Sequence, residues 1–194
     1  MLEIFNDIYN LIMDLITGSS FYGPIIACLL IFIESILPVL PLFVFITILF
    51  ISYGYYWGYI LSYVLTCLGC FFSFYLCRKY MRNFFIKNIR KVDKLDKFMK
   101  IIDKISLSNL AMLIAIPFTP AFAINIAAAI SNMNFKKYAI AIIIGKIFMV
   151  AFWGFIGTSL IESLKNPKIM LIVIGMMLIT FVMSKLINKK LKIE

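Results

Sequence analysis

The chain has 194 residues, of which 63% are hydrophobic and 14% are charged. Soluble domains have about 45–50% apolar and about 25% charged residues, so these values exclude a soluble globule and predict an integral membrane protein. Nineteen Lys and Arg against nine Asp and Glu give a net charge of +10. Because the basic residues lie between apolar segments, we expect them to face anionic lipid rather than nucleic acid. The sequence contains no histidine, which excludes His-based acid–base catalysis and His-ligated metals, and we expect no metal or cofactor.

Residues 1–20 have the pattern of a helix that lies along a membrane surface. In residues 1–17, apolar side chains recur at helical spacing with acidic side chains between them, and Gly18-Ser19-Ser20 ends the run. Such a segment is typical of an interfacial amphipathic helix rather than a span. It has no basic stretch and no small-residue cleavage site, so we expect no cleavable signal peptide.

Residues 21–54 are almost wholly apolar, and their length fits neither one membrane crossing nor two. One crossing takes about 20 residues, and two crossings with a turn would need more residues than this run offers. Pro38 and Pro41 lie near its middle, where each removes an amide donor and clashes with the preceding turn. We therefore predict a re-entrant hairpin, which enters and leaves the membrane on one side and is buried in protein or lines a watery cavity.

Residues 105–133 repeat this pattern, with Pro117 and Pro120 near the centre of an apolar run. A second re-entrant hairpin is predicted here. A hairpin keeps the C-terminal lysines on the same side of the membrane as the basic segment 78–104, whereas a single kinked crossing would separate them. The positive-inside rule therefore favours the hairpin.

Three other runs have the length and apolarity of transmembrane helices, at 56–77, 138–161 and 168–187. The basic segment 78–104 keeps its apolar residues at helical spacing, so we expect an amphipathic helix on the cytoplasmic surface. The sequence thus predicts a single all-α polytopic membrane domain over residues 1–194. We expect it in a bacterial plasma membrane, with its C-terminus in the cytoplasm.

The two predicted hairpins share a motif. Pro38-x-x-Pro41-Leu42-Phe43 in the first corresponds to Pro117-x-x-Pro120-Ala121-Phe122 in the second, and a span follows each hairpin. In the topology above, the first hairpin enters from outside and the second from inside, which makes an inverted repeat. Secondary transporters place their substrate sites near the midplane between such paired broken helices. The alternative is that P-x-x-P occurs twice by chance.

A set of short motifs within residues 24–160 carries a family resemblance. It comprises an acid before the first proline pair, glycines in the following span, and a second proline pair with an asparagine after it. The motifs are Glu34-x-x-x-Pro38-x-x-Pro41, Gly54, Gly58, Gly69, Tyr75, Arg78, Ile116-Pro117-Phe118-Thr119-Pro120, Asn125, Met133, Phe135 and Gly145-Lys146. With these motifs the chain resembles the DedA family of SNARE-associated, or VTT-domain, membrane proteins, and within it the branch with a P-F-x-P…N second hairpin.

The resemblance implies two re-entrant hairpins that face each other and a function in transport or scrambling of lipids. The cargo proposed for bacterial members is undecaprenyl phosphate or phospholipid, with proton coupling suggested for some. The chain departs from the family at two positions. Ile114 stands where many relatives carry an arginine, and Pro120 stands where DedA members proper often carry a second one.

Glu34 is the strongest candidate for a functional residue. If its helix begins near Pro24, a rise of about 1.5 Å per residue puts the carboxylate about 15 Å deep, in the middle of a hydrocarbon core about 30 Å thick. A charge at that depth costs roughly 2.5–3.5 kcal/mol. We therefore expect Glu34 to handle a proton or a lipid headgroup, the alternative being a structural hydrogen bond to the free amides of the hairpin.

Lys146 is the second charge within an apolar run, about 12 Å from the inner surface if counted from Tyr138. A functional role would pair it with Glu34 or with a lipid phosphate, and the alternative is that its long side chain reaches the interface. Since Ile114 replaces the arginine of many relatives, Lys146 is the best remaining cation for an anionic headgroup.

Asn125 and Thr119 supply polar groups to the second hairpin, either for substrate or for the hairpin's own unpaired backbone. We expect four prolines to act only by fixing the breaks in the two hairpins. They are Pro38, Pro41, Pro117 and Pro120.

Cys67 and Cys70 form a C-x-x-C pair in the middle of a predicted span. Without a basic neighbour to activate them, we interpret them as packing residues, and a membrane thiol oxidoreductase is a minor alternative. Gly154 and Gly157 indicate close helix packing.

These observations predict a protein that is not an enzyme and that moves phospholipid or polyprenyl-phosphate headgroups between leaflets, as a transporter, flippase or scramblase. The sequence contains no ATP-binding P-loop, so transport would be passive, coupled to protons or sodium, or dependent on another subunit. Anionic lipid headgroups are the expected partners, and a homo-oligomer is left open. The alternative is a non-transporting scaffold for envelope maintenance or division that acts through residues 78–104.

Overall fold

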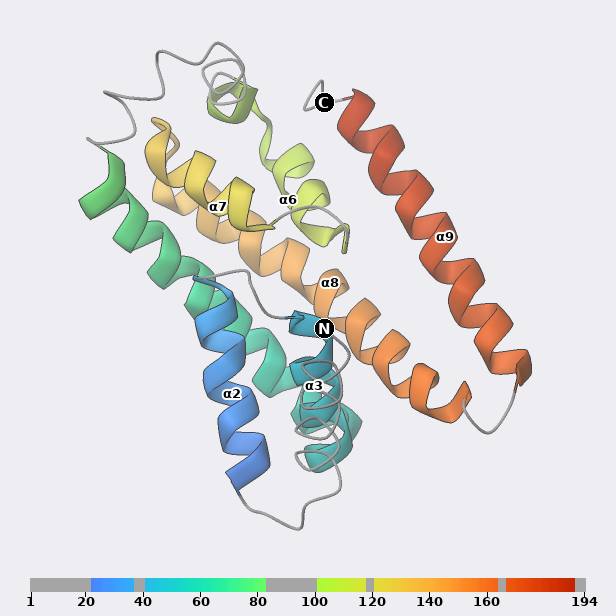
Figure 1. Ribbon diagram of the computed structural model, residues 1–194. Helices are drawn as coiled ribbons and strands as arrows, with labels where there is room; N and C mark the ends of the chain where they lie inside the picture. The colour runs from blue at the N-terminus through green and yellow to red at the C-terminus, as the bar shows by residue number, and fades with distance from the viewer. Residues whose placement is uncertain (1–21, 37–40, 83–100, 118–120, 164–166, 191–194) are drawn as a thin grey trace, which may run out of the picture.

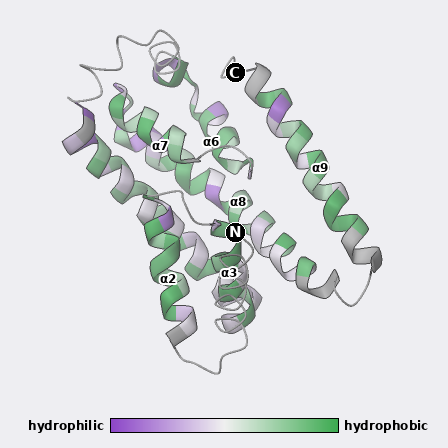
Figure 2. Ribbon diagram, viewed as in Figure 1, coloured by the Kyte–Doolittle hydropathy of each residue, from purple (hydrophilic) through white to green (hydrophobic). Residues whose placement is uncertain are grey.

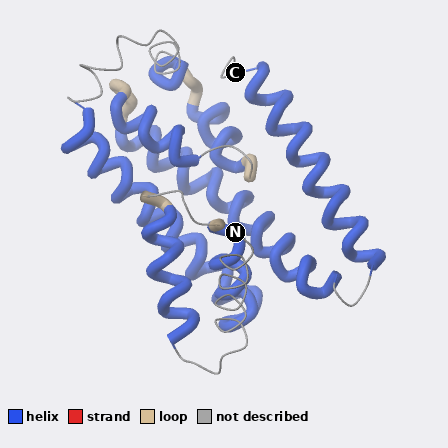
Figure 3. Tube along the Cα trace, viewed as in Figure 1, coloured by secondary structure: helices blue, strands red, loops and turns tan. Residues whose placement is uncertain are grey.

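The computed structural model describes residues 22–36, 41–82, 101–117, 121–163 and 167–190. These residues form helices joined by short loops and contain no strand (Figure 3). The elements are α2 (Tyr22–Glu34), α3 (Leu42–Leu76), the π-helical turn η1 (Cys77–Met81), α6 (Leu107–Ala115), α7 (Ala121–Ile130), α8 (Phe135–Ser163) and α9 (Pro167–Lys190).

Helix α3 consists of two helical parts separated at Gly54. This glycine has φ 74° and ψ 175°, a conformation that only glycine adopts readily because it has no Cβ. The direction of the chain changes there, so residues 42–53 form one helical arm and residues 55–76 a second, longer one. The break was not predicted as a conformational feature, although its position agrees with the predicted end of the first hairpin.

The first hairpin consists of α2 and residues 42–53 of α3, and the second consists of α6 and α7. In Figure 1 the two arms of each hairpin run in opposite directions, and the two hairpins approach the centre of the molecule from opposite ends. The described residues that flank the two breaks therefore lie toward the centre of the molecule. Residues of both hairpins line one cavity, among them Ser35 and Leu42 of the first and Phe122 and Asn125 of the second, so the hairpins meet there.

The hairpin helices are short. Helix α2 has 13 residues, α6 has 9 and α7 has 10, which at about 1.5 Å per residue makes each about 20 Å long or less. A hydrocarbon core is about 30 Å thick, so none of these arms could cross it alone. This agrees with re-entrant hairpins, whose placement in a membrane stays a prediction.

Two helical stretches among the described residues are long and apolar enough to cross a membrane, Leu42–Tyr80 with 39 residues and Phe135–Leu160 with 26. Because Gly54 divides the first, its part beyond residue 54 corresponds to the predicted span 56–77. Within α9, Leu171–Ile187 is a shorter apolar helix. The prediction of an all-helical protein with long apolar helices is confirmed. The predicted interfacial helix at 1–20 and most of the basic segment lie outside the described residues.

The long part of α3 packs antiparallel to α8. The hydroxyl of Tyr59 donates a hydrogen bond to the carbonyl of Ile147 at 3.0 Å, and the hydroxyl of Tyr63 donates to that of Ile143 at 2.9 Å. As the number rises on one helix it falls on the other, which is the relation that an inverted repeat requires of its long helices.

Both hairpins contact α8 through glycines that leave no room for a Cβ. On each of three glycines an added Cβ would overlap a side chain of a hairpin. Glycine at such places lets helices approach closely, so the packing role expected for two of these glycines is confirmed. The pairs are Gly154 with Phe50, Gly157 with Thr47, and Gly145 with Ile114.

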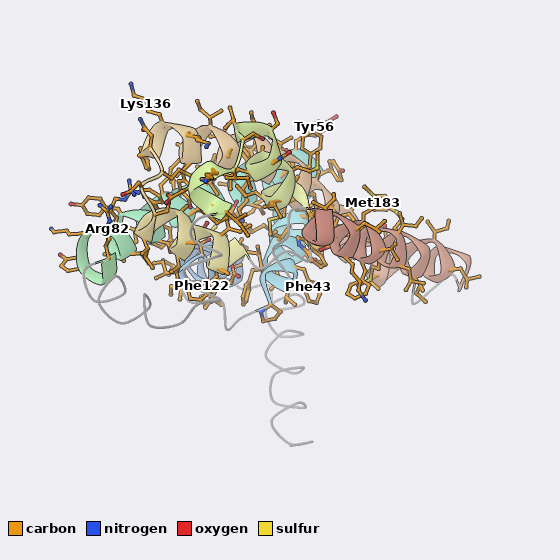
Figure 4. The ribbon with its side chains drawn as sticks, turned by 90° about the horizontal axis from the view of Figure 1, so that it is seen from above. Phe43, Tyr56, Arg82, Phe122, Lys136 and Met183 are labelled. Carbon is orange, nitrogen blue, oxygen red and sulfur yellow. The ribbon has the colours of Figure 1, made fainter. Side chains whose placement is uncertain are left out.

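Hydrophobic residues cover the outside of the helices as well as the inside (Figure 2). Large apolar side chains are strongly exposed on several helices, among them Tyr56 at 83% and Leu171 at 70%. In Figure 4, Phe43 and Phe122, which hold matching positions in the two proline motifs, lie on the same side of the molecule. An apolar exterior of this extent suits a hydrocarbon environment rather than water.

Candidate functional site

A cavity of about 30 Å³ lies between described residues of the two hairpins and the two long helices. That space suffices for a water molecule. Both hairpins and both long helices contribute to its wall, so residues that are far apart in the sequence come together here. It is lined by Glu34, Ser35, Leu42, Cys70, Phe122, Asn125, Lys146 and Met149.

Lys146 lies on α8 and is buried, with 2% of its surface exposed. Its ammonium Nζ donates to the sulfur Sδ of Met149 at 3.3 Å. Among the described residues that thioether is its one hydrogen-bond acceptor, and a thioether sulfur is a weak acceptor for a group with three N–H donors. A buried charge with so little compensation is costly, and the ammonium retains donor capacity for an anion or water in the cavity.

Glu34 is the last residue of α2 and is half-buried beside the same cavity. A carboxylate at a helix C-terminus lies at the negative end of the helix dipole, which disfavours its charge. Burial disfavours the charge further, and the positive charge of Lys146 opposes the effect of burial, although the two do not form a direct ion pair. The predicted neighbourhood of these two charges is therefore present, with a cavity between them.

Asn125 is 1% exposed and belongs to a buried hydrogen-bond group. Its Oδ1 accepts from the hydroxyl of Tyr138 at 2.8 Å, and its Nδ2 lies 3.5 Å from the sulfur of Cys70. The Tyr138 hydroxyl also lies 3.2 Å from the carbonyl oxygen of Cys70. These bonds join α7, α8 and α3, so Asn125 holds the second hairpin against both long helices as well as lining the cavity.

Two helices begin at the cavity. Helix α3 starts at Leu42, and its N-cap, Pro41, provides no side-chain hydrogen bond to the first turn. Phe122 lies in the first turn of α7 and also lines the cavity. Helix N-termini present free amides and a partial positive charge. Together with Lys146 they make this side of the cavity favourable for an anion.

The same part of the chain matches a known family. Residues 37–159 match the model of the VTT domain, which covers more than half of the chain and includes both hairpin breaks. The chain belongs to the VTT-domain family. This is the family of the DedA proteins, so the predicted family is confirmed, and a membrane location follows from it.

A curated relative of this VTT-domain protein is a membrane protein of Bacillus subtilis, YhjE, which is described as uncharacterized. The two sequences are 29% identical over 173 residues, which cover 89% of this chain and 84% of YhjE. No solved structure matches the chain.

Five of the predicted site residues lie in the part of the chain that the structure describes. Glu34, Lys146 and Asn125 line the cavity, and Pro41 directly precedes α3. Pro117 lies in the break after α6. The remaining candidates lie outside the described residues: Thr119, Pro38 and Pro120.

Ile114 stands where many relatives have an arginine, and its surroundings are apolar. The side chain is buried and packs against Gly145, which directly precedes Lys146 on α8. The VTT domain of this chain therefore closes the contact between α6 and α8 with an aliphatic side chain. Among the described lining residues, Lys146 is the one cation at the cavity.

Cys67 and Cys70 are free thiols and are buried in the hydrophobic core around the second hairpin. Cys70 lines the cavity and lies beside Asn125. Their burial agrees with packing residues, because reactive cysteines are partly exposed. The expectation that they have no basic neighbour is wrong, since Lys146 lines the same cavity as Cys70 and interacts electrostatically with Cys67.

Arg78 has a structural role that its place in the family motif does not predict. Its guanidinium donates to the carbonyls of Ala128, Ala129, Ser131 and Met133 at 2.8–3.2 Å, and it stacks on the ring of Phe74 with 4.4 Å to the centroid. It thus binds carbonyls at the C-terminal end of α7 and in the residues that follow it, where helical hydrogen bonds end. No signal in the sequence pairs an arginine with carbonyls about fifty residues away.

Proposed function

We propose that this protein moves anionic membrane lipids between the two leaflets, as a transporter, flippase or scramblase. The observation that carries the proposal is Lys146, a buried ammonium with one weak acceptor, facing a cavity between two broken helices. Phospholipid or polyprenyl-phosphate headgroups supply the phosphate that such a cation would bind. Protons or sodium are the candidate coupling ions, with Glu34 as the group that would receive them.

Short helical hairpins give a physical reason why the free-energy barrier to moving a headgroup through the bilayer would be low. A headgroup that crosses a bilayer must leave water for hydrocarbon, and the cost of moving a charge through that core is several kcal/mol or more. Two re-entrant hairpins that meet near the midplane would replace part of the core with polar backbone ends and charged side chains. A headgroup would then pass Lys146 and Glu34 while its acyl chains stay in the bilayer.

The proposal includes a topology. The hairpins would enter from opposite sides of a bacterial plasma membrane, with the long helices crossing it and the C-terminus in the cytoplasm. The antiparallel arrangement of α3 and α8 supports this, because transporters with inverted repeats place their sites between such halves.

Lipid exchange in proteoliposomes tests the function. The purified full-length protein is reconstituted in phosphatidylcholine vesicles with a fluorescent phosphatidylglycerol, and a membrane-impermeant quencher reports the outer leaflet over time. We expect the protein to accelerate exchange. Lys146→Met should slow it about tenfold, which corresponds to a loss of about 1.5 kcal/mol for a hydrogen bond to a charged group. Glu34→Gln should also slow exchange if proton binding limits it.

Lys185→Met is the matched control, because Lys185 is an exposed lysine on α9 and should leave the rate unchanged. The assay is repeated with a fluorescent polyprenyl phosphate. If neither lipid exchanges faster with the protein than without it, the proposal of lipid movement is wrong and the alternative of a non-transporting scaffold is favoured. If exchange is fast but insensitive to Lys146→Met, the site assignment is wrong.

A further inference from the structure

A second hollow lies outside the cavity, between α6 and α8. This groove has a volume of about 390 Å³ and runs from Leu107 to Ala115 on α6, with Ile144 and Phe148 on α8 as its other wall. The volume is within the range of ligand sites in proteins, about 300–1,000 Å³. The lining is apolar except for the hydroxyl of Ser108, so the groove suits a hydrocarbon chain.

The groove is separate from the candidate site. Its residues on α8, Ile144 and Phe148, are exposed, and Phe148 is 62% exposed. The cavity residues of α8, Lys146 and Met149, are buried on another face of the same helix. Gly145, which lies between Ile144 and Lys146 in the sequence, packs against Ile114 of α6.

The length of the groove corresponds to one leaflet. From Leu107 to Ala115, α6 rises about 12 Å, and half of a hydrocarbon core is about 15 Å. A chain lying along α6 would therefore reach from the start of the helix toward the level of the hairpin breaks.

One end of the groove is cationic. Lys104 is exposed just before α6, and the ammonium of Lys137 donates to the carbonyl of Ile105 at the same end. The groove begins at Leu107 and Ser108, in the first helical turn, whose amides have no acceptor within the helix. Ser106 Oγ accepts the amide of Asn109. The nearby Asp103 is engaged by the backbone amide of Asn132.

We propose that the groove binds one acyl chain of an anionic phospholipid, with the phosphate at the start of α6 beside Lys104. The bilayer interior is as apolar as the groove, so burial of the chain supplies little net free energy. Selectivity for this lipid over others comes from the charge of its headgroup, because a basic residue near the membrane surface attracts anionic lipid. This site lies away from the cavity, and the proposal holds whether or not the protein moves lipids.

Photolabelling in vesicles of defined composition tests the proposal. The full-length protein is reconstituted in phosphatidylcholine that contains either phosphatidylglycerol or phosphatidylcholine with a diazirine near the end of one acyl chain. After illumination, mass spectrometry of peptides locates the label. Exposed Leu178 on α9 reports contact with bulk lipid in the same sample. We expect phosphatidylglycerol to label Met112 and Phe148 more than Leu178, and phosphatidylcholine to show no such preference.

Two variants examine the two ends of the groove. Lys104→Gln should lower the preference for phosphatidylglycerol about fivefold, the contribution of one basic residue near an anionic surface. Lys79→Gln, at an exposed lysine on η1, is the matched control and should leave it unchanged. Ala115→Phe fills the apolar end and should reduce labelling of Phe148 to the level of Leu178, with the helical content unchanged by circular dichroism.

The proposal is overturned if the groove residues and Leu178 are labelled equally with both lipids, or if the two lipids label the groove equally. It is also overturned if a Met112→Cys variant forms disulfide-linked dimers in the vesicles, since a second copy would then occupy the groove. Because labelling is read without any exchange assay, a failure of lipid movement does not affect these outcomes. The Lys146→Met variant should be labelled in the groove to the same extent as the wild type, because the groove and the cavity are separate sites.

Discussion

Glu34 at the end of α2 and Lys146 in the middle of α8 line one cavity, although they are far apart in the sequence. The two charges interact without a direct ion pair. Each charge therefore lowers the cost of burying the other while leaving space between them. This relationship links the fold to the proposed function, because it brings the end of the first hairpin and the middle of α8 to one cavity.

The first prediction concerns the coupling of these two residues. Glu34→Gln and Lys146→Met should each change the free energy of unfolding, and the double variant should differ from the sum of the two by about 0.5–3 kcal/mol, as for neighbouring interacting residues. The double variant should be destabilised less than the sum of the two single variants, because it leaves no uncompensated buried charge. Thermal unfolding in detergent, followed by tryptophan fluorescence, measures it. Additive effects of the two substitutions on the free energy of unfolding would mean that the two charges do not interact.

The second prediction concerns Arg78. Arg78→Gln removes donors from carbonyls at the end of α7 and should destabilise the protein by about 2–4 kcal/mol, given about 1.5–3 kcal/mol for a hydrogen bond to a charged group and incomplete additivity. Hydrogen exchange should rise in α7 more than in α9. Lys79→Gln on the same turn is the control. Equal protection of α7 in wild type and Arg78→Gln would contradict the role assigned to the guanidinium.

The third prediction concerns the close approach of the first hairpin to α8. Gly157→Ala places a Cβ against Thr47 and should destabilise the protein by about 1–3 kcal/mol through overpacking. Gly175→Ala on α9 is matched, because nothing lies within 4 Å of its added Cβ. It should raise the stability slightly, as Ala favours a helix more than Gly does. The difference in midpoint temperature between the two variants is the readout.

The fourth prediction concerns the break in α3. At Gly54 an added Cβ would meet no atom within 4 Å, but φ is 74°. Gly54→Ala should therefore lower stability by about 1–2 kcal/mol through backbone strain alone. Gly54→Asn should lower it by a similar amount, because Asn tolerates a positive φ in the left-handed helical region and not at ψ 175°. Equal midpoint temperatures for wild type and Gly54→Ala would show that the backbone relaxes into a continuous helix.

Composition and prolines sufficed to predict much of the architecture. Apolar runs longer than one crossing and shorter than two, with Pro41 and Pro117 inside them, indicated two broken hairpins, and Glu34 and Lys146 stood out as charges among apolar residues. Such features are local, so a sequence displays them directly. The helices at α8 and α9 also fall where long spans were expected, although their passage through a membrane stays a prediction.

Other features depend on contacts between distant segments. Arg78 binds carbonyls in another helix, and backbone carbonyls carry no sequence signature. The groove beside Phe148 exists because α6 and α8 leave space on one side, which depends on the angle between two helices. The bend at Gly54 follows from a backbone conformation that glycine permits but does not require.

Helix α8 fixes the relative placement of the two hairpins through the spacing of its glycines. Gly145 packs against the second hairpin, and Gly154 and Gly157 pack against the first. Each residue turns an α-helix by about 100°, so a single insertion between Gly145 and Gly154 would rotate one docking surface away from its hairpin while leaving the other intact. The number of residues in that stretch of α8 therefore sets the alignment of the two halves, and homologous chains should vary there by substitution rather than by insertion or deletion.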